Sequence, residues 1–531
     1  MYPDILIAQL DLVNASREQR KALALAPVTA QDKAALLKQH HPDYRDSGFR
    51  DLRIGANKGD RVTHEFADLL ESFSSLDHSG ISLEPEVTTD VLVLGGGGAG
   101  VTAALFAANQ GARVLLATKL RLGNSNTIMA LGGMQAAVTE QDSPVKHFAD
   151  TMSAGGFAGN RQLVRALVED APAIVAWLLQ IGVNFDREAN GDLAARMAAG
   201  MSAPRILSIG DHTGLNLMKV LKDELRKSER VELSEFTPAV ELTTNDTGAC
   251  NGAILYDLDR RRHFVVKARA VILATGGAGR LHNQGFPTSN NFGATGDAIV
   301  MAYRAGARMD GLDSFQYHPT GVMFPEHMVG VLVTEAIRGL GAHLVNARGE
   351  RFINELETRD VVAAAIIREC ASGNGVRTPS GKTGVWLDMP VLEELCGQGT
   401  LRKRFPALFK KFMRVRIDVA KRPLLVYPTL HYQNGGVLID AAGESTIRNL
   451  FVAGEAAGGI HGRNRAMGNA LLDIFVFGRR AGLAAAGRMG QHPGKPTLKH
   501  VADYYGRLKS LRISSVAKSP TLFPEFIVDK I

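Results

Sequence analysis

Three glycines near residue 95 have a spacing suited to binding phosphate. Gly95, Gly97 and Gly100 form the pattern G-x-G-x-x-G within Gly95-Gly-Gly-Gly-Ala-Gly100. In such a loop the first glycine permits a tight turn, and the second lets the backbone approach a pyrophosphate. The third lets the following helix pack closely on the strand. The phosphates would lie at the positive end of that helix. We therefore expect a dinucleotide-binding loop here.

A simple NAD site lacks one of its usual residues in this chain. An acidic ribose partner is expected about 20 residues after the loop, but that position reads Ala117-Thr118-Lys119. Two other segments could approach a cofactor, Asn291-Phe-Gly-Ala-Thr-Gly-Asp297 and Gly454-Glu455. Either segment alone could be an ordinary loop with a capping acid. Their joint occurrence favours one long ligand, such as FAD, that spans several loops.

The elements that must position these loops form a predicted βαβ unit. Asp90-Val-Leu-Val-Leu is typical of a buried parallel strand. The small residues from Val101 to Asn109 predict a helix, and Arg113-Val-Leu-Leu-Ala predicts the second strand. Later apolar strands end in Thr275-Gly-Gly-Ala-Gly279 and in Gly454-Glu455, so several glycine loops follow strand ends.

Composition excludes several classes of protein. At 531 residues the chain should form two or more domains, and 45% hydrophobic with 22% charged residues is typical of a globular protein. The net charge is +7, but no run of five basic residues occurs, so we expect no nucleic-acid binding. The N-terminus lacks a secretory signal, and no stretch of 18 uninterrupted apolar residues predicts membrane insertion.

The three cysteines, Cys250, Cys370 and Cys396, are far apart in the sequence and form no C-x-x-C pair. This spacing argues against a disulfide framework, a zinc site and an iron–sulfur cluster held by this chain alone. We therefore predict no metal site and expect reduced thiols in the cytoplasm.

Seven further motifs carry a family resemblance. They are Ser125-Asn-Thr-Ile-Met-Ala-Leu-Gly-Gly133, His318-Pro-Thr-Gly321, Thr334-Glu-Ala-Ile-Arg-Gly339, Arg351-Phe-Ile-Asn-Glu355, Thr358-Arg-Asp360, His431-Tyr-Gln-Asn-Gly-Gly436 and His461-Gly-Arg-Asn-Arg465. In content and order the chain resembles the flavoprotein subunits of succinate dehydrogenase and fumarate reductase. That FAD-dependent family also includes L-aspartate oxidase. The resemblance runs from about residue 88 to residue 488.

With this resemblance, the predicted fold class is α/β, a Rossmann-like FAD-binding domain with an inserted α+β capping domain. The region 320–425 lacks the strand-to-glycine pattern and is the predicted cap. The full prediction is an N-terminal extension (1–85), the first part of the FAD-binding domain (86–319), the capping domain (320–425), the second part of the FAD-binding domain (426–490) and a short C-terminal segment (491–531). The extension is expected to be a docking arm or a surface wrap.

The resemblance implies transfer of hydride between FAD and a C4 dicarboxylate, fumarate or succinate. It also implies that His318, His431 and Arg465 bind the two carboxylates, with help from Thr334. Cationic and hydrogen-bond-donating side chains suit a substrate with two negative charges. Singly, each of these residues would be taken for an ordinary structural residue.

The resemblance further implies that Arg359 is the general acid and that Glu335 and Arg338 return a proton to it. An arginine is an unusual acid, because its pKa lies above about 12. Glu335 and Arg338 are three residues apart, so on a helix they would share a face. Without the surrounding motif the same pair would be taken for a helix-surface salt bridge.

Eighteen residues are implied to bind the cofactor, including Thr118-Lys119 where the family usually has Ser-Lys in place of a ribose-binding acid. They are Gly95, Gly97, Gly98, Ala99, Gly100, Thr118, Lys119, Asn126, Thr127, Gly132, Gly133, Thr275, Gly276, Gly277, Asp297, Glu455, Asn469 and Leu471.

The chain departs from the family pattern at two informative positions. Asn126 stands where many members have the histidine that carries FAD covalently, so we predict dissociable FAD and easier fumarate reduction than succinate oxidation. Arg463 stands where members often have alanine, and it could alter substrate preference. A long helical C-terminal domain is expected to be absent or shortened, which puts the usual docking surface for a partner in doubt.

Other functions remain open on sequence alone. L-aspartate oxidase, or a reductase of another α,β-unsaturated acid, would use the same cationic residues. A non-catalytic flavin-binding scaffold would not need them. Electrons are expected from an iron–sulfur subunit or from a free reduced carrier, because no haem motif and no second nucleotide fingerprint occurs. We expect a cytoplasmic protein, which partner subunits could hold at the inner face of the membrane.

Overall fold

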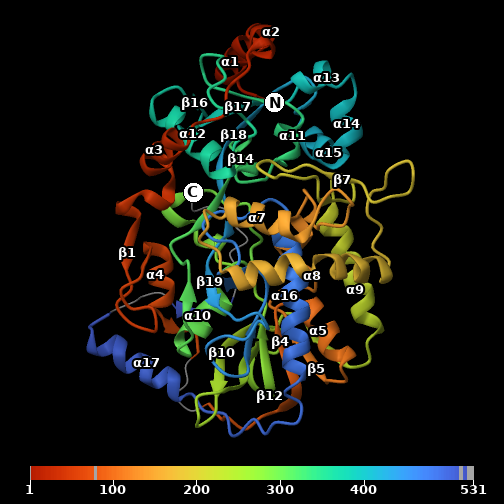
Figure 1. Ribbon diagram of the computed structural model, residues 1–531. Helices are drawn as coiled ribbons and strands as arrows, with labels where there is room; N and C mark the ends of the chain where they lie inside the picture. Colours follow the sequence, from red (N-terminus) through yellow and green to blue (C-terminus); the bar gives the residue numbers. More distant parts are fainter. Residues whose placement is uncertain (1, 77–80, 514–517, 523–531) are drawn as a thin grey trace.

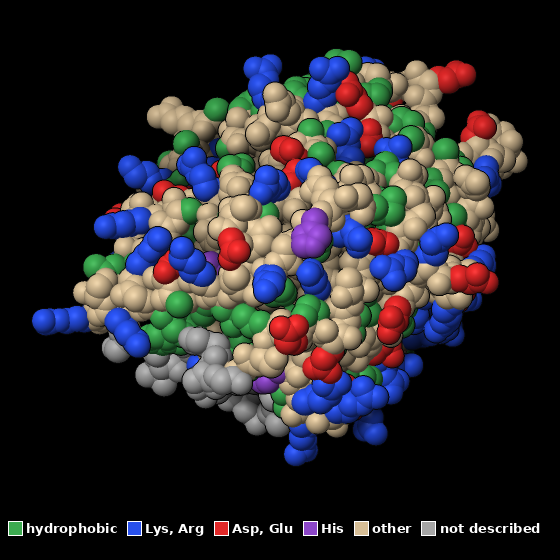
Figure 2. Space-filling view, turned by 90° about the horizontal axis from the view of Figure 1, so that it is seen from below, with side chains coloured by type: hydrophobic (Ala, Val, Ile, Leu, Met, Phe, Trp, Pro, Cys, Tyr) green, Lys and Arg blue, Asp and Glu red, His purple; other side chains and the backbone are tan. Residues whose placement is uncertain are grey.

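The computed structural model describes residues 2–76, 81–513 and 518–522. It has two units, one above the other in Figure 1, each with its own sheet and its own hydrophobic core. No helix among the described residues is both long enough and apolar enough to cross a bilayer. The face seen in Figure 2 carries Lys and Arg side chains spread over its whole extent, with acidic side chains among them.

The lower unit is built on a seven-stranded sheet. Its parallel strands, in spatial order, are β9 (Val231–Ser234), β5 (Val114–Ala117), β4 (Val87–Leu94), β12 (Arg262–Leu273) and β20 (Leu450–Val452). The antiparallel strands β11 (Cys250–Asp257) and β10 (Ala239–Thr244) extend it beyond β12. The predicted βαβ unit is therefore present, and both of its strands lie at the centre of the sheet.

Two helices pack against each other over this sheet, α5 (Gly98–Asn109) and α16 (Asn469–Ala486). Glycines in α16 allow the close approach. A Cβ added to Gly482 would lie 2.4 Å from the carbonyl oxygen of Ala103, and one on Gly478 would lie 2.8 Å from that of Ala99. Glycine costs about 1 kcal/mol in a helix interior, and here that cost is offset by close packing.

Other elements of the lower unit surround the sheet and carry its loops. They are α6 (Asn126–Met129), β6 (Met134–Gln135), α7 (Pro144–Ala154), α8 (Arg161–Gln180), β7 (Ala195–Arg196), β8 (Ile206–Leu207), α9 (Thr213–Lys227), α10 (Asp297–Arg304), β13 (Met309–Asp310), β19 (Gly436–Leu438), β21 (Ala457–Gly458) and α17 (Lys499–Ser510). The short β3 (Phe73–Ser74) and β22 (Lys518–Ser519) pair in parallel.

The upper unit is an antiparallel sheet with helices. Its strands are β14 (Phe315–Val322), β18 (Leu424–Gln433), β17 (Thr383–Asp388), β15 (His343–Val345) and β16 (Val376–Arg377). Its helices are α11 (Ala336–Gly339), α12 (Arg359–Ala371), α13 (Val391–Leu395), α14 (Thr400–Arg404) and α15 (Pro406–Arg414). The predicted limits at 320 and 425 fall inside β14 and β18, the two strands that enter and leave this unit.

The N-terminal segment packs on both cores. The helices α1 (Asp4–Ala15), α2 (Arg17–Ala22) and α3 (Ala30–His40) lie against the upper unit, and Leu6 and Leu10 belong to its core. The elements β1 (Phe49–Asp51), β2 (Arg61–Thr63) and α4 (His64–Leu70) lie lower, and Leu52 and Phe66 belong to the other core. This segment is therefore anchored by buried side chains at both ends.

Candidate active site

One cavity of about 630 Å³ joins the two groups of predicted site residues. The glycine loop and the end of β5 contribute to its wall from the lower unit. His318, Arg359 and His431 contribute from the upper unit, and Arg465 comes from a loop that returns to the lower one. A ligand in this cavity would therefore touch the dinucleotide loop and the cationic residues at once.

The glycine loop has no room for side chains. Gly95 has φ of +118°, which favours glycine, and a Cβ there would lie 2.3 Å from the carbonyl oxygen of Ala274. A Cβ on Gly100 would lie 1.9 Å from the carbonyl oxygen of Gly95. Gly97 and Gly98 begin α5, where the N–H of Gly98 donates to Thr127 Oγ1 at 3.1 Å. The backbone is thus exposed to a ligand at the positive helix end.

Lys119 is fixed at the end of β5 by a distant loop. Its ammonium donates to Asp297 Oδ2 at 2.6 Å and to Thr295 Oγ1 at 2.7 Å. Thr118 packs on the glycine loop, since its Oγ1 would lie 2.9 Å from a Cβ on Gly96. Thr118, Lys119 and Asp297 all line the cavity, so the sequence motif 291–297 and the end of β5 form one wall.

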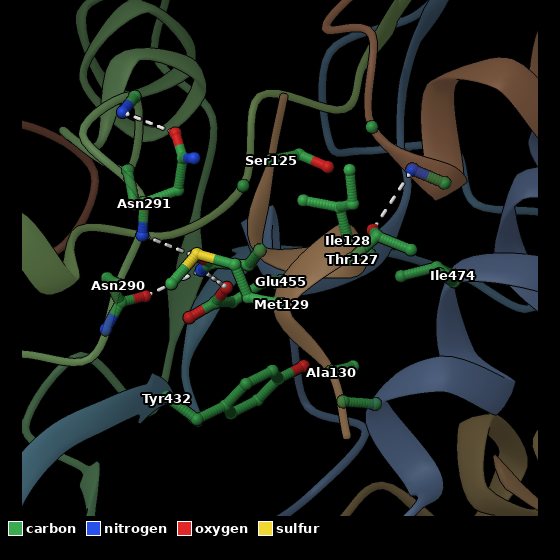
Figure 3. A pocket seen from close by; sticks show the side chains of 18 of the residues that line it. Ser125, Thr127, Ile128, Met129, Ala130, Asn290, Asn291, Tyr432, Glu455 and Ile474 are labelled. Atoms are coloured by element: carbon green, nitrogen blue, oxygen red, sulfur yellow. Dashed lines mark hydrogen bonds between the residues drawn. The ribbon is translucent and has the colours of Figure 1, made fainter. Parts of the chain in front are cut away.

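Asn126 lines the cavity and is held in a hydrogen-bond network by Asn290, Asn291 and Glu455, three residues labelled in Figure 3. Its Nδ2 donates to Asn290 Oδ1 at 2.6 Å and to Glu455 Oε2 at 3.1 Å, and its Oδ1 accepts from the N–H of Asn291 at 2.7 Å. Burial raises the pKa of Glu455. A Cβ on Gly277 would lie 2.7 Å from Glu455 Oε1, so that glycine makes room for the carboxylate.

Some predicted cofactor residues do not reach the cavity wall. Gly100 and Gly277 are not lining residues, but their lack of a side chain allows Gly95 and Glu455 to lie close to them. Asn469 is fully buried, and its side-chain amide is bound to His147 Nε2 and to Thr151 Oγ1, each at 3.0 Å. Asn469, the first residue of α16, therefore fixes this helix to α7 and does not lie on the cavity surface. The remaining members of the predicted set line the cavity, namely Gly132, Gly133, Thr275, Gly276, Leu471, Ala99 and Thr127.

His318 and His431 lie side by side on neighbouring strands, with ring centroids 5.3 Å apart. Burial and the nearby charge of Arg359 hold the pKa of each well below its usual value, so both are neutral. His318 Nδ1 accepts from the N–H of Thr320 at 3.2 Å, which leaves Nε2 as the protonated donor. His431 Nδ1 lies 2.8 Å from Ser289 Oγ. Two neutral imidazoles therefore reach the cavity.

Arg465 is a buried cation that forms no ion pair within the described residues. It lines the cavity, and its Nη2 donates to Gln316 Oε1 at 2.9 Å. Its guanidinium carbon lies 4.5 Å from the centre of the Tyr432 ring. Its Nε has no acceptor, and no carboxylate of the described residues makes an ion pair with it. Burial and the charge of Arg359 lower its pKa to about 10.

Arg359, Glu335 and Arg338, which the motifs singled out, lie together as a buried series. Arg359 Nε donates to Glu335 Oε2 at 2.6 Å, and Arg338 Nη2 lies 3.4 Å from the same oxygen. Burial favours the neutral form of Glu335, but the two arginines outweigh it and hold its pKa below the usual value. Arg359 and Glu335 line the cavity beside Thr334, whereas Arg338 lies behind them.

Gln316 is a site residue that sequence reasoning missed. Its Oε1 accepts from Arg359 Nη1 at 2.8 Å and from Arg465 Nη2 at 2.9 Å, so one amide oxygen joins the two cations. Gln316 precedes His318 by two residues on β14, and such residues share a face of a strand. Because side chains alternate along a strand, the position of Gln316 two residues before His318 could have identified it from the sequence.

Arg463 does not reach the substrate region. Its guanidinium pairs with Asp313 at 3.0 Å, and its backbone carbonyl accepts from Ser314 Oγ and from Asn434 Nδ2. It is absent from the residues that line the cavity. The ion pair with Asp313 therefore holds the Arg463 side chain outside the cavity, and an influence of Arg463 on substrate preference would have to be indirect.

The chain is similar to known proteins in sequence and in structure. The family model described as FAD binding domain matches residues 90–471. A fumarate reductase (CoM/CoB) subunit of Methanothermobacter marburgensis is 40% identical over 452 residues, covering 83% of this chain and 79% of the relative. An L-aspartate oxidase of Synechocystis is 37% identical over 398 residues, 73% and 69% of the two chains. A quinol fumarate reductase structure from E. coli matches with TM-score 0.73 and 30% identity, covering 81% and 75%.

Proposed function

This chain belongs to the FAD-binding domain family and takes FAD as its cofactor, and on that premise we propose that it is the flavoprotein subunit of a fumarate reductase or succinate dehydrogenase. The observation that carries the proposal is Arg465, a buried cation on the cavity wall whose Nε finds no acceptor in the part of the chain that the structure describes. Buried donors in native proteins are nearly always paired. A substrate carboxylate would supply the missing acceptor.

The cavity fits a long flavin cofactor. Because no side chain fits at Gly95 or Gly100, the backbone of the glycine loop can contact the pyrophosphate of FAD. The Glu455 carboxylate on the cavity wall can accept hydrogen bonds from hydroxyl groups of FAD. We infer that the parallel sheet is a Rossmann-like FAD-binding domain and that the upper unit is its capping domain. This inference is supported by the βαβ unit at the glycine loop and by residues of the upper unit on the same cavity wall.

FAD supplies the hydride that one alkene carbon of fumarate accepts. Arg465, His318, His431 and Thr334 would bind the carboxylates and stabilise the negative charge that develops during transfer. Arg359 would protonate the other carbon, and its hydrogen bond to Glu335 fixes its orientation. With two electrons and two protons, fumarate then becomes succinate.

The acids on the cavity wall favour fumarate over L-aspartate. Among the described lining residues the carboxylates are Asp297, Glu335 and Glu455. Asp297 is paired with Lys119, Glu335 is paired with Arg359, and Glu455 accepts from Asn126. Glu455 is the one of these three without a cationic partner, and we assign it to the hydroxyl groups of FAD, so the α-ammonium of aspartate would face arginines without a carboxylate left to bind it.

We further propose that FAD binds without a covalent link. An amide at Asn126 is not a nucleophile, and its three hydrogen bonds hold it in the network with Glu455. Acid precipitation of the purified protein should release all of its flavin to the supernatant. Flavin that stays with the precipitate would contradict this part of the proposal.

The relative from M. marburgensis is named as one subunit of its enzyme, and we propose that this chain also works with a partner. The partner would be an iron–sulfur protein that exchanges electrons with the flavin. Attachment to the inner face of a membrane would then depend on partner subunits. Purification of the native complex, followed by analysis of its iron content, would test both points.

The direct test supplies the FAD-loaded protein with a chemically reduced viologen dye and fumarate. Arg359→Ala should lower kcat by about 10²- to 10⁴-fold, because a general acid contributes that much. Arg368→Ala, on the same helix but near its exposed end, is the matched control and should leave kcat unchanged. Fumarate turnover by Arg359→Ala at the wild-type rate would refute the assigned role, and oxidation of L-aspartate without fumarate turnover would favour the alternative.

A further inference from the structure

The buried series of Arg359, Glu335 and Arg338 continues away from the cavity. Arg338 is almost fully buried, and its Nη1 donates to the backbone carbonyl of Glu355 at 2.5 Å. Its Nε has no acceptor within the described residues. Besides Glu335, the carboxylate that raises the pKa of Arg338 against the effect of burial is that of Glu355. The backbone of Glu355 therefore holds Arg338 in position, and the nearby Glu355 carboxylate favours the charged form of Arg338.

Glu355 is itself held by a third arginine. Its Oε2 accepts from Arg351 Nη2 at 2.6 Å, and its Oε1 accepts from Arg351 Nε at 3.1 Å and from the N–H of Leu344 at 3.0 Å. This bidentate contact fixes the carboxylate strongly. From the cavity outward the charges alternate through Arg359, Glu335, Arg338, Glu355 and Arg351, which gives three cations and two anions.

The N-terminal segment holds the outer end of this series. Arg351 Nη1 donates to the carbonyl oxygen of Leu23 at 2.6 Å and to that of Arg20 at 3.2 Å. Nearby, Asn354 Nδ2 donates to the carbonyl oxygen of Leu25 at 3.2 Å. The Arg351 side chain keeps an exposed fraction of only 12%. Figure 1 shows α1 and α2 on the upper unit, where these contacts occur.

We propose that Glu355 and Arg351 are positioning residues for the return of a proton to Arg359, and that residues 20–25 of the N-terminal segment complete this arrangement. The proposal rests on the proposed function. In each turnover one proton passes from Arg359 to the substrate carbon, and one proton from solvent replaces it. Glu355 and Arg351 end the cycle in the protonation states in which they began.

Within the described residues, the ionisable groups near the Glu355 carboxylate are Arg351, which pairs with it, and Arg338 and His343 (on β15), which interact with it through charge. Burial lowers the pKa of His343 to about 4, so it stays neutral in the working range. Arg20 in turn contacts His343 Nδ1 and Asp388. Removing the charge of Glu355 would therefore leave Arg338 with Glu335 as its remaining carboxylate neighbour in the series.

The test compares Glu355→Gln with Glu357→Gln. Glu357 is the matched control because it is also buried and also binds the N-terminal segment, through the N–H of Val28 and Lys33 Nζ, each at 2.7 Å. Both variants are loaded with FAD, and kcat and KM for fumarate are measured from pH 6 to pH 10 with reduced viologen.

Glu355→Gln should lower kcat on the order of tenfold to a hundredfold, the cost of a misplaced catalytic group, with KM within about twofold of wild type. The limb of the kcat profile at high pH should move to lower pH, because Arg338 loses a neighbouring negative charge. Glu357→Gln should keep the wild-type profile. Glu355→Asp should restore part of kcat.

A wild-type profile for Glu355→Gln, or an equal shift for Glu357→Gln, would overturn the proposal. If Glu355→Gln does not fold, Arg351→Lys gives the same test, because lysine keeps the charge but lacks the bidentate geometry. It should show a smaller shift in the same direction, and an unchanged profile would count against the proposal. Absence of fumarate turnover in the wild-type protein would instead refute the proposed function itself.

Discussion

Arg465 illustrates how a single residue acquires its role from its surroundings. The guanidinium is buried, stacks on Tyr432 and shares the amide oxygen of Gln316 with Arg359. These contacts fix its direction, but none of the described carboxylates forms an ion pair with it. A planar guanidinium held in this way is suited to a carboxylate, and a lysine ammonium could not reproduce both contacts.

Arg465→Lys should therefore weaken dicarboxylate binding more than it changes the chemical step. Loss of charge-assisted hydrogen bonds costs about 1.5–3 kcal/mol, which corresponds to roughly a tenfold to hundredfold higher Kd. Malonate, a non-reacting dicarboxylate, can be titrated against the visible spectrum of the flavin to measure this Kd. Arg463→Lys, outside the cavity and paired with Asp313, is the control and should bind malonate as the wild type does.

At the scale of elements, the glycine loop depends on contact between α5 and the loop before it. Gly100→Ala would place a Cβ 1.9 Å from the carbonyl oxygen of Gly95, so helix and loop must separate. Overpacking of this kind costs about 1–3 kcal/mol. We expect a lower Tm and a clear loss of FAD affinity.

The helical glycine Gly506, in α17, provides the matched control for Gly100→Ala. Apart from the backbone of α17 itself, no atom of the described residues lies within 4 Å of a Cβ added there, so Gly506→Ala should keep or raise the Tm and leave FAD affinity unchanged. Equal Tm and equal flavin affinity for the two variants would show that the close packing at Gly100 does not matter.

A second element-scale contact joins the two units. Asp211 Oδ2 accepts from the N–H groups of Ala407 and Leu408, at 2.8 and 3.4 Å, and so caps α15 from the other unit. The helix has no side-chain cap of its own. Asp211→Ala should therefore cost about 1 kcal/mol and increase amide hydrogen exchange in Pro406–Arg414. Ser143→Ala, which removes the cap of α7, should increase exchange in α7 and leave α15 unaffected.

At the scale of the whole molecule, buried histidines predict sensitivity to acid. His147 is fully buried against Asn469, and burial lowers its pKa to about 4 from 6.5. Between these two values the unfolded chain binds a proton that the folded chain does not. The contribution to stability is therefore complete above pH 6.5 and is lost as the pH falls toward 4.

By pH 5 this single group should reduce the free energy of unfolding by about 2 kcal/mol. Urea unfolding at pH 7.5 and pH 5 measures the difference, with FAD kept saturating at both. His147→Gln can still donate to Asn469 and should show a smaller loss between the two pH values. An equal loss in wild type and variant would assign the acid sensitivity to other groups.

The sequence by itself determined the local chemistry of this protein. The glycine spacing at 95–100 and the strands on either side of it were readable, because backbone turns and strand periods depend on neighbouring residues. The motifs around His318 and Arg465 were readable only through their resemblance to a known family. Only the tertiary structure decided which side chains contact one another across long distances in the sequence. Lys119 meets Asp297, 178 residues away, and Asn469 turns to His147 instead of the cavity. Gln316 joins two arginines, and the N-terminal segment reaches Arg351, because contacts between distant side chains exist only once the sheets and helices have packed.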